Sequence, residues 1–77
     1  METKEEILKE VGARLRKFRN EKGYNREFIA KHLCITERTY ASYERGEHDI
    51  PMDVMYKLAI MYRTTLANLI DYKKAHK

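Results

Sequence analysis

The chain has 77 residues, of which 43% are hydrophobic and 36% are charged, and its net charge is +4. This composition fits one folded domain rather than a disordered chain, and the longest apolar run, residues 58–62, is far too short to cross a membrane. The opening METKEE does not read as a signal or transit peptide, so we expect a cytoplasmic protein with no membrane partner.

The first predicted helix runs over residues 3–22. Thr3 followed by Glu6 forms a capping box at its start, and Gly23 ends it because glycine tolerates the left-handed conformation. Apolar side chains recur at three- and four-residue spacing and predict one inward stripe. The stripe consists of Leu8, Val11, Leu15 and Phe18, with Ile7 alongside.

Two short helices are predicted next, over residues 26–33 and 37–45. Asn25 caps the first, Thr36 caps the second, and Gly46 ends the second. Their inward faces are apolar or aromatic, which predicts that both pack on a core. These faces consist of Ile29, Ala30 and Leu33 on the first helix, and Tyr40 and Tyr43 on the second.

A fourth helix is predicted over residues 52–62, with Pro51 at its start, and a fifth from a Thr65 cap to near Tyr72. Their predicted core residues are Met55, Leu58, Ala59, Tyr62, Leu66, Leu69 and Ile70. Because no segment has a strand pattern, we expect an all-α, compact five-helix bundle over residues 1–72, followed by a flexible basic tail over 73–77.

The joint between the second and third helices, residues 34–36, is very short. Such a joint forces a sharp angle, which is the helix-turn-helix arrangement. Ala30 provides the small residue that close approach requires, while Tyr40 and Tyr43 can anchor the third helix from behind. The front of that helix is then free to face outward in a fixed pose.

Residues 11–70 resemble the helix-turn-helix domain of Cro and phage repressors, also called the Xre type. The stretches that carry the resemblance are VGARLRKFRNEKGYNREFIAKHL, ITERTYASYERGEHDIP and MDVMYKLAIMYRTTLANLI. The resemblance implies a lambda-repressor-like bundle whose third helix reads the major groove of double-stranded DNA. It further implies sequence-specific regulation of transcription, with repression as the first expectation.

By this resemblance, two sets of residues are candidates for contact with DNA. Arginine can donate two hydrogen bonds to guanine, glutamate can accept one from cytosine, and serine can pair with several bases. The candidate base-contacting residues are Glu37, Arg38, Ala41 and Ser42. The candidate phosphate-contacting residues are Asn25, Arg26, Thr39 and Arg45. A net charge of +5 over residues 14–45, between acidic flanks, favours an electrostatic footprint on DNA.

The resemblance also implies a homodimer on a two-fold operator, and an internal ion pair. Apolar residues beside the inner stripe of the fourth helix need a partner surface more than core residues do. The candidate dimer interface consists of Ile60, Met61, Arg63 and Leu66. Arg19 and Glu44 each follow a core position and match family positions that pair, so we expect a partly buried ion pair between them.

Three departures from the family pattern leave alternatives open. Cys34 occupies a turn that usually holds glycine, so the backbone there either avoids positive φ or accepts strain. Arg26 replaces the frequent glutamine, and Glu47 and Asp49 place acid where several relatives are basic. These acids keep a second interpretation open, in which the fold serves as a protein-interaction module such as an antitoxin or an assembly partner.

The sequence offers no candidate for catalysis or for a cofactor. It contains no Ser-His-Asp set, no phosphate-cradling glycine-rich loop and no paired carboxylates in an apolar setting. Cys34 is the single cysteine, which excludes an internal disulfide and suits a turn filler better than a redox switch. The three histidines lack zinc-ligand spacing, so we expect neither a metal nor an enzyme.

Overall fold

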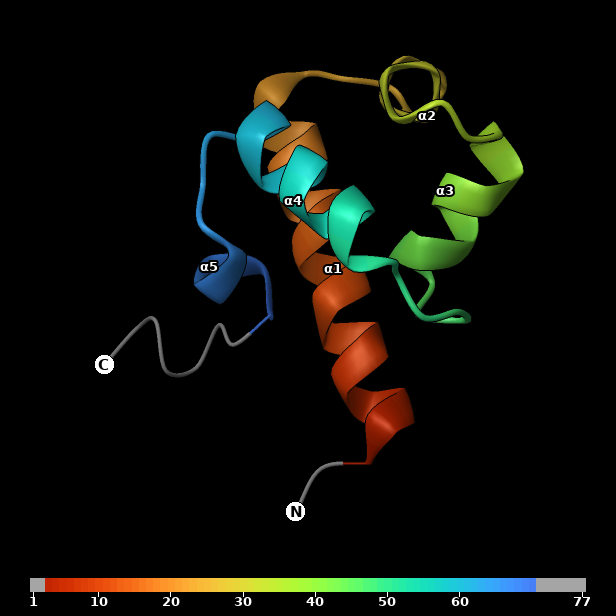
Figure 1. The fold of residues 1–77 in the computed structure, drawn as a ribbon, viewed down its shortest axis with the longest axis vertical. Coiled ribbons are helices and arrows are strands. Elements are labelled where there is room, and N and C mark those ends of the chain that lie inside the picture. Colours follow the sequence, from red (N-terminus) through yellow and green to blue (C-terminus); the bar gives the residue numbers. More distant parts are fainter. Residues whose placement is uncertain (1–2, 71–77) are drawn as a thin grey trace.

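The structure, a computed structural model, describes residues 3–70 and folds them into five α-helices (Figure 1). The helices are α1 (Lys4–Lys22), α2 (Arg26–Leu33), α3 (Glu37–Glu44), α4 (Met52–Met61) and α5 (Leu66–Ile70). No strand is present among the described residues, and the predicted all-α bundle is confirmed. The expected tail over 73–77 and the predicted end of the last helix near Tyr72 lie outside the described residues.

α1 is the longest helix, and the others are arranged around it (Figure 1). α3 and α5 pack against α1, α2 packs against α3 and α4, and α4 packs against α5. In the view of Figure 1, α4 runs across the front of α1, with α2 and α3 to one side and α5 to the other. The helix-turn-helix pair therefore lies at one side of the bundle.

Side-chain caps fix where the helices begin. Thr3 Oγ1 accepts from the Glu6 backbone N–H at 3.2 Å, and Glu6 Oε1 accepts from the Thr3 backbone N–H at 3.0 Å. Asn25 Oδ1 accepts from the Phe28 backbone N–H at 2.8 Å at the start of α2. Each bond satisfies a backbone donor that has no partner inside its own helix.

The core gathers apolar and aromatic side chains from all five helices. Its buried members are Val11, Leu15, Ile29, Ala30, Leu33, Tyr40, Tyr43, Val54, Met55, Leu58, Ala59, Tyr62 and Leu69. Two predictions on the inward faces are wrong, because Ile7 and Ile70 are each 41% exposed. Ile7 lies near the start of α1, which extends beyond the other helices in Figure 1, and Ile70 is the last residue of the five-residue α5.

Two glycines allow close backbone approach to α1. A Cβ on Gly12 would lie 2.6 Å from the carbonyl oxygen of Tyr43, and it would also overlap the carbonyl oxygen of Glu44. Gly46 has φ 71° and a Cβ there would lie 2.7 Å from the Cα of Lys9. No larger side chain fits at either position without moving backbone, so these glycines set how closely α3 and its exit pack on α1.

A buried arginine ties α1 to α5. Arg14 is 8% exposed, and its Nε donates to the Leu69 carbonyl at 2.8 Å while its Nη2 donates to the Ile70 carbonyl at 2.7 Å. The last carbonyls of a helix lack partners within it, so a cation there satisfies them and interacts favourably with the helix dipole. Among residues 3–70, no helix is both long enough and apolar enough to cross a membrane.

Candidate nucleic-acid interface

The joint between α2 and α3 turns through a left-handed residue. Cys34 has φ 59° and ψ 39°, its N–H donates to the Lys31 carbonyl at 3.2 Å, and the Ile35 N–H donates to the Ala30 carbonyl at 3.0 Å. Of the two alternatives left open by the sequence, the structure adopts positive φ at Cys34. The two bonds satisfy the last carbonyls of α2 while the chain turns sharply into α3.

α3 is fixed from behind by buried tyrosines. Tyr40 is fully buried, and its hydroxyl lies 2.7 Å from the hydroxyl of Tyr62 at the end of α4. Burial raises the pKa of Tyr62 to about 12, and it raises the pKa of Tyr40 still further above its usual value. Both rings therefore stay neutral, and their bond joins α3 to α4 at the centre of the core.

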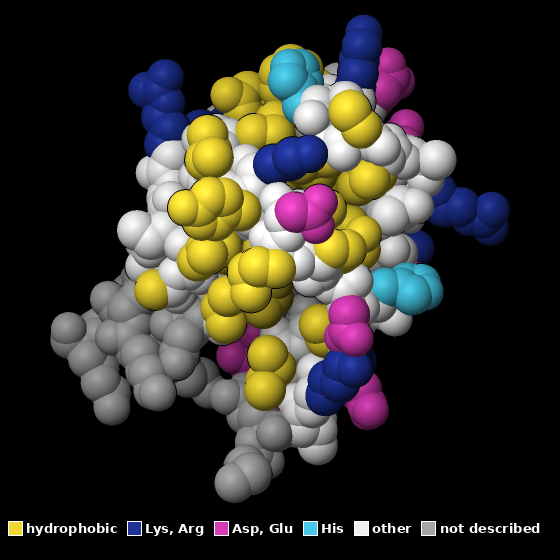
Figure 2. Space-filling model, viewed as in Figure 1, with side chains coloured by type: hydrophobic (Ala, Val, Ile, Leu, Met, Phe, Trp, Pro, Cys, Tyr) yellow, Lys and Arg dark blue, Asp and Glu magenta, His cyan; other side chains and the backbone are white. Residues whose placement is uncertain are grey.

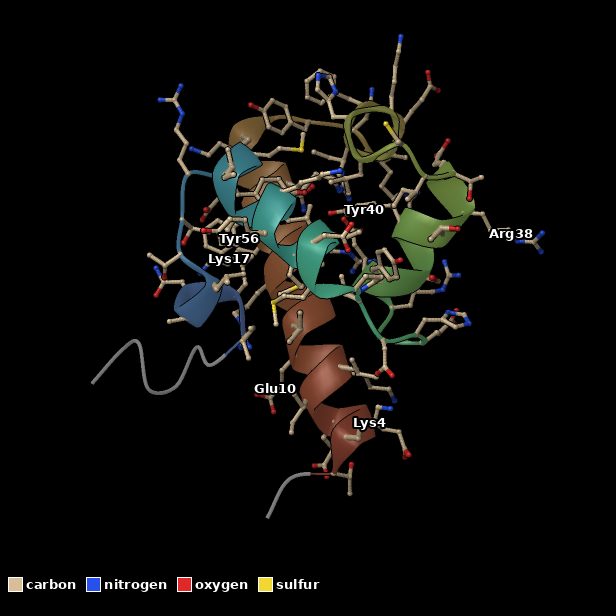
Figure 3. The ribbon with its side chains drawn as sticks, in the orientation of Figure 1. Lys4, Glu10, Lys17, Arg38, Tyr40 and Tyr56 are labelled. Carbon is tan, nitrogen blue, oxygen red and sulfur yellow. The ribbon has the colours of Figure 1, made fainter. Side chains whose placement is uncertain are left out.

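The amino end of α3 faces outward. Thr36 Oγ1 accepts from the Thr39 backbone N–H at 3.0 Å, which starts the helix, and Glu37 and Arg38 are exposed. In Figure 3, Arg38 points away from the body of the protein. Ala41 is half-buried on the same helix. Glu37 and Arg38 thus project from the amino end of α3, and the buried Tyr40 holds that helix in place.

Ser42 makes a hydrogen bond within its own helix. It is 7% exposed, and its Oγ donates to the Thr39 carbonyl of its own helix at 2.6 Å. A serine hydroxyl has one proton to donate, so a base could meet Ser42 only as an acceptor unless this bond opens. The proton of the Ser42 hydroxyl is therefore engaged within α3.

The four candidate phosphate contacts lie in different environments. Arg26 is exposed at the start of α2, and Asn25 uses its Oδ1 for the cap, which leaves its amide nitrogen free of the capping bond. Thr39 is half-buried, and its Oγ1 accepts from Thr36 Oγ1 at 2.9 Å. Arg45 is exposed but already engaged by an acidic neighbour.

That neighbour is Glu47, two residues further along the chain. Arg45 Nε donates to Glu47 Oε2 at 3.0 Å, and Arg45 Nη2 donates to Oε1 at 3.1 Å. This hydrogen-bonded pair lowers the pKa of Glu47 and raises the pKa of Arg45. The other loop acid, Asp49, pairs with Lys4 at 2.9 Å. Sequence reasoning singled out both acids but assigned neither a partner.

An open hollow of about 570 Å³ lies along α3 and the loop that follows it. Arg38 and Arg45 line it from α3 and its carboxyl end, and Glu47, His48 and Asp49 line it from the loop. Both signs of charge therefore border the outer face of α3. Among residues 3–70, no cluster of three or more histidine, cysteine, aspartate or glutamate side chains could hold a metal ion.

The predicted ion pair is formed. Arg19 Nε donates to Glu44 Oε2 at 2.6 Å, and the side chain of Glu44 is 1% exposed. The candidate dimer residues divide into two kinds. Ile60 and Arg63 are exposed, whereas Met61 and Leu66 are half-buried and pack against the core.

A family model described as helix-turn-helix matches residues 15–69. The chain belongs to the Cro/C1-type helix-turn-helix family. Two curated relatives, from Thermococcus kodakarensis and Pyrococcus furiosus, are each named as an HTH-type transcriptional regulatory protein. Both are 33% identical to this helix-turn-helix chain over 64 residues. Those 64 residues are 83% of this chain but 20% of each relative, so the chain spans about a fifth of the length of the curated relatives it matches.

Solved helix-turn-helix structures have the same fold. The DNA-binding domain of BldD superposes with a TM-score of 0.73 at 25% identity, covering 86% of this chain and 96% of that domain. The clp gene regulator ClgR from C. glutamicum gives 0.77 at 18% identity, covering 91% of each chain. The hypothetical transcription factor NHTF from Neisseria gives 0.79 at 17% identity, covering 99% of this chain and 90% of that one, and both of these likenesses concern the fold alone.

Proposed function

We propose that this helix-turn-helix protein binds double-stranded DNA sequence-specifically and regulates transcription, first of all as a repressor. The observation that carries the proposal is the pose of α3. Its back is locked by the Tyr40–Tyr62 bond, while Glu37 and Arg38 project from its exposed amino end. A rigid helix with donors and acceptors at its front suits the major groove. The curated relatives and the BldD domain support this assignment through their names.

The proposal divides the side chains of the reading surface by chemistry. Arg38 donates two hydrogen bonds to a guanine, Glu37 accepts from a cytosine, and Ala41 offers a methyl group to a thymine. Ser42 is retained as an acceptor only, because its proton is already donated to the Thr39 carbonyl. Base specificity then depends mainly on the first turn of α3.

The backbone of the DNA is held by a second group. Arg26 supplies charge from the start of α2, and Asn25 and Thr39 supply polar atoms near helix amino ends, where backbone N–H groups also favour phosphate. Arg45 reaches a phosphate once Glu47 releases it. Contacts of this kind position the protein without reading sequence.

We further propose that the protein binds a two-fold operator as a homodimer. The surface expected from the sequence consists of Ile60, Met61, Arg63 and Leu66. Ile60 and Arg63 are free to contact a second copy, whereas Met61 and Leu66 already pack on the core and can contribute only their outer edges.

Binding to duplex DNA over a series of salt concentrations tests the proposed function. The protein should bind random duplex at low salt, and the logarithm of its affinity should fall linearly with that of the salt concentration. Selection from a pool of random oligonucleotides should then recover one preferred operator. Absence of binding to any duplex at low salt would contradict the proposal.

One observation favours the alternative of a protein-interaction module. The two loop acids carry negative charge beside the proposed DNA face, where Glu47 pairs with Arg45 and Asp49 pairs with Lys4 from the start of α1. If DNA binding is absent, this neutralised surface is the first place to look for a protein partner. The same salt series therefore separates the two functions.

A further inference from the structure

α4 carries an apolar stripe that faces away from the core. Met52, Tyr56 and Ile60 follow one another at four-residue spacing and are 64%, 61% and 68% exposed. They are the three most exposed of the large hydrophobic side chains among the described residues. Figure 2 shows hydrophobic side chains gathered over this face of the molecule. Residues spaced by four lie on one side of a helix, so the stripe is continuous.

A charged flank accompanies the stripe. Asp53 and Lys57 each follow a stripe residue by one position, so both lie along the same edge of α4. Both are exposed, and neither takes part in a salt bridge within residues 3–70. Opposite charges along one edge of an apolar helix face suit a helix with the opposite charge order beside it.

We propose that α4 packs antiparallel against α4 of a second copy of this chain, with Tyr56 on the two-fold axis. Met52 and Ile60 each lie four residues from Tyr56, so Met52 of one copy faces Ile60 of the other. Measured along the helix axis, Asp53 of one copy lies about 3 Å from Lys57 of the other, given a rise of 1.5 Å per residue. The surface is self-complementary, as a two-fold interface requires, because its apolar side chains meet apolar side chains and its acidic side chain meets its basic one.

The two-fold axis of the proposed dimer also places α3 of both copies on one side of the dimer. Two antiparallel helices packed face to face are related by a two-fold axis perpendicular to them and within the plane of contact. In Figure 1, α2 and α3 both lie to one side of α4, so this axis carries both helix-turn-helix units to the same side of the dimer. This step rests on the proposed DNA-binding function, whereas the contact itself does not.

The proposal relocates the dimer interface expected from the sequence. Ile60 belongs to both versions, but the centre of the interface moves from Met61 at the end of α4 and Leu66 on α5 to Tyr56 in the middle of α4. Met61 and Leu66 pack against the core, whereas the side chains of the stripe have no such cover.

Sedimentation equilibrium without DNA tests the contact. The parent chain should dimerise, and Ile60→Glu should raise the dimer dissociation constant by about tenfold or more, since a charge would face an apolar surface. Ile7→Glu is the matched control, because Ile7 is also exposed but lies on α1. Circular dichroism shows whether each variant is folded. A parent that stays monomeric at millimolar concentration, or equal dimerisation of parent and Ile60→Glu, would overturn the proposal.

Charge exchange tests the antiparallel register. Asp53→Lys gives a chain with a wholly basic flank, and Lys57→Asp gives one with a wholly acidic flank. Each variant alone should dimerise at least about tenfold more weakly than the parent, because like charges meet. Their equimolar mixture should form a heterodimer that recovers most of the affinity. No recovery in the mixture would overturn the register.

Failure of this proposal is distinguishable from failure of the proposed function. A monomer that still binds duplex DNA would exclude the α4 contact and leave DNA binding intact. A dimer with the expected response to both sets of variants, but with no affinity for DNA, would support the α4 contact and contradict the proposed function.

Discussion

Arg19 and Glu44 join the end of α1 to the end of α3 through two hydrogen bonds. Arg19 Nε and Glu44 Oε2 are 2.6 Å apart, and Arg19 Nη2 and Glu44 Oε1 are 3.3 Å apart. The hydrogen bond to Glu44 raises the pKa of Arg19, so the guanidinium stays charged. Arg19 also donates to the Tyr24 carbonyl at 3.0 Å, which extends the link to the chain entering α2. The pair therefore connects the helix-turn-helix to the rest of the bundle.

Removal of one member of this pair should be strongly destabilising. We expect Arg19→Ala to lower the free energy of unfolding by about 3–5 kcal/mol, because it leaves the buried Glu44 carboxylate without its main partner. Arg16, whose Nε lies 3.9 Å from Glu44 Oε1, should keep the loss near the lower value. The measurement is chemical denaturation. Lys4→Ala is the control, since it breaks the exposed pair with Asp49 and should lower stability by less than about 1 kcal/mol.

Gly12→Ala should destabilise the fold, although it improves helix propensity. In an open helix this change stabilises by up to about 1 kcal/mol. Here the added methyl group would overlap the Tyr43 and Glu44 carbonyls, so we expect a loss of about 3 kcal/mol. Thermal unfolding measures it, with Ala13→Gly as a control at an exposed site of the same helix. A stability gain for Gly12→Ala would show that α1 and α3 do not approach this closely.

Local signals in the sequence predicted most of this fold. Thr3 with Glu6, Asn25 and Thr36 mark helix starts through short-range hydrogen bonds, and all of these bonds are formed. Such signals depend only on neighbours in the chain, so they are readable before any packing is known. The sequence also placed Cys34 in the turn between α2 and α3. Whether its backbone adopts positive φ depended on how tightly the two helices pack, which the sequence does not show.

Contacts between distant residues were largely out of reach of the sequence, and the one that was predicted, Arg19–Glu44, came from the family resemblance rather than from spacing. The Tyr40–Tyr62 bond spans 22 positions and depends on where α3 meets α4. Arg14 was not singled out from the sequence, although its place three residues after Val11 puts it in the inward stripe. Ser42 was assigned by family position alone, and the sequence did not show that its hydroxyl donates to the Thr39 carbonyl of its own helix. Which side chains meet is decided by packing, not by spacing.

The buried tyrosine pair predicts a non-additive response to mutation. Tyr40→Phe and Tyr62→Phe should each lower the free energy of unfolding by about 1–3 kcal/mol, because each leaves one buried hydroxyl without its partner. The double variant should lose clearly less than the sum, since it removes both hydroxyls together. Denaturant unfolding of the four proteins measures the coupling. Additive losses would show that the two hydroxyls do not interact.

The same tyrosines predict when the protein unfolds in alkali. The pKa of Tyr62 in the folded protein is about 12, above its usual value of 10.0, because burial disfavours the charged form. A raised pKa gives stability that is fully present below the unfolded pKa and is lost as pH rises through the folded pKa. Stability should therefore hold to about pH 10 and fall between pH 10 and 12. Tyr62→Phe should flatten this fall in a pH series of unfolding measurements.

Release of Arg45 should strengthen binding to every DNA sequence. Glu47→Gln removes the carboxylate that accepts from Nε and Nη2 of Arg45, which leaves the guanidinium free for phosphate. We expect higher affinity for random and preferred duplexes alike, and a salt slope steeper by about one unit. Asp49→Asn is the matched control, because it removes one charge from the same loop but leaves the Arg45–Glu47 pair intact. Equal salt slopes for the two variants would mean that Arg45 does not reach a phosphate.

The central claim is that the front of α3 reads bases, and binding of Arg38→Ala to preferred and scrambled operators tests it most directly. The variant should lose about 1–3 kcal/mol on the preferred operator and little on the scrambled one, with relaxed preference at one position per half-site. Arg26→Ala should instead weaken both alike and flatten the salt dependence by about one unit. An equal loss by Arg38→Ala on both operators would contradict the account, because the arginine would then hold only the backbone.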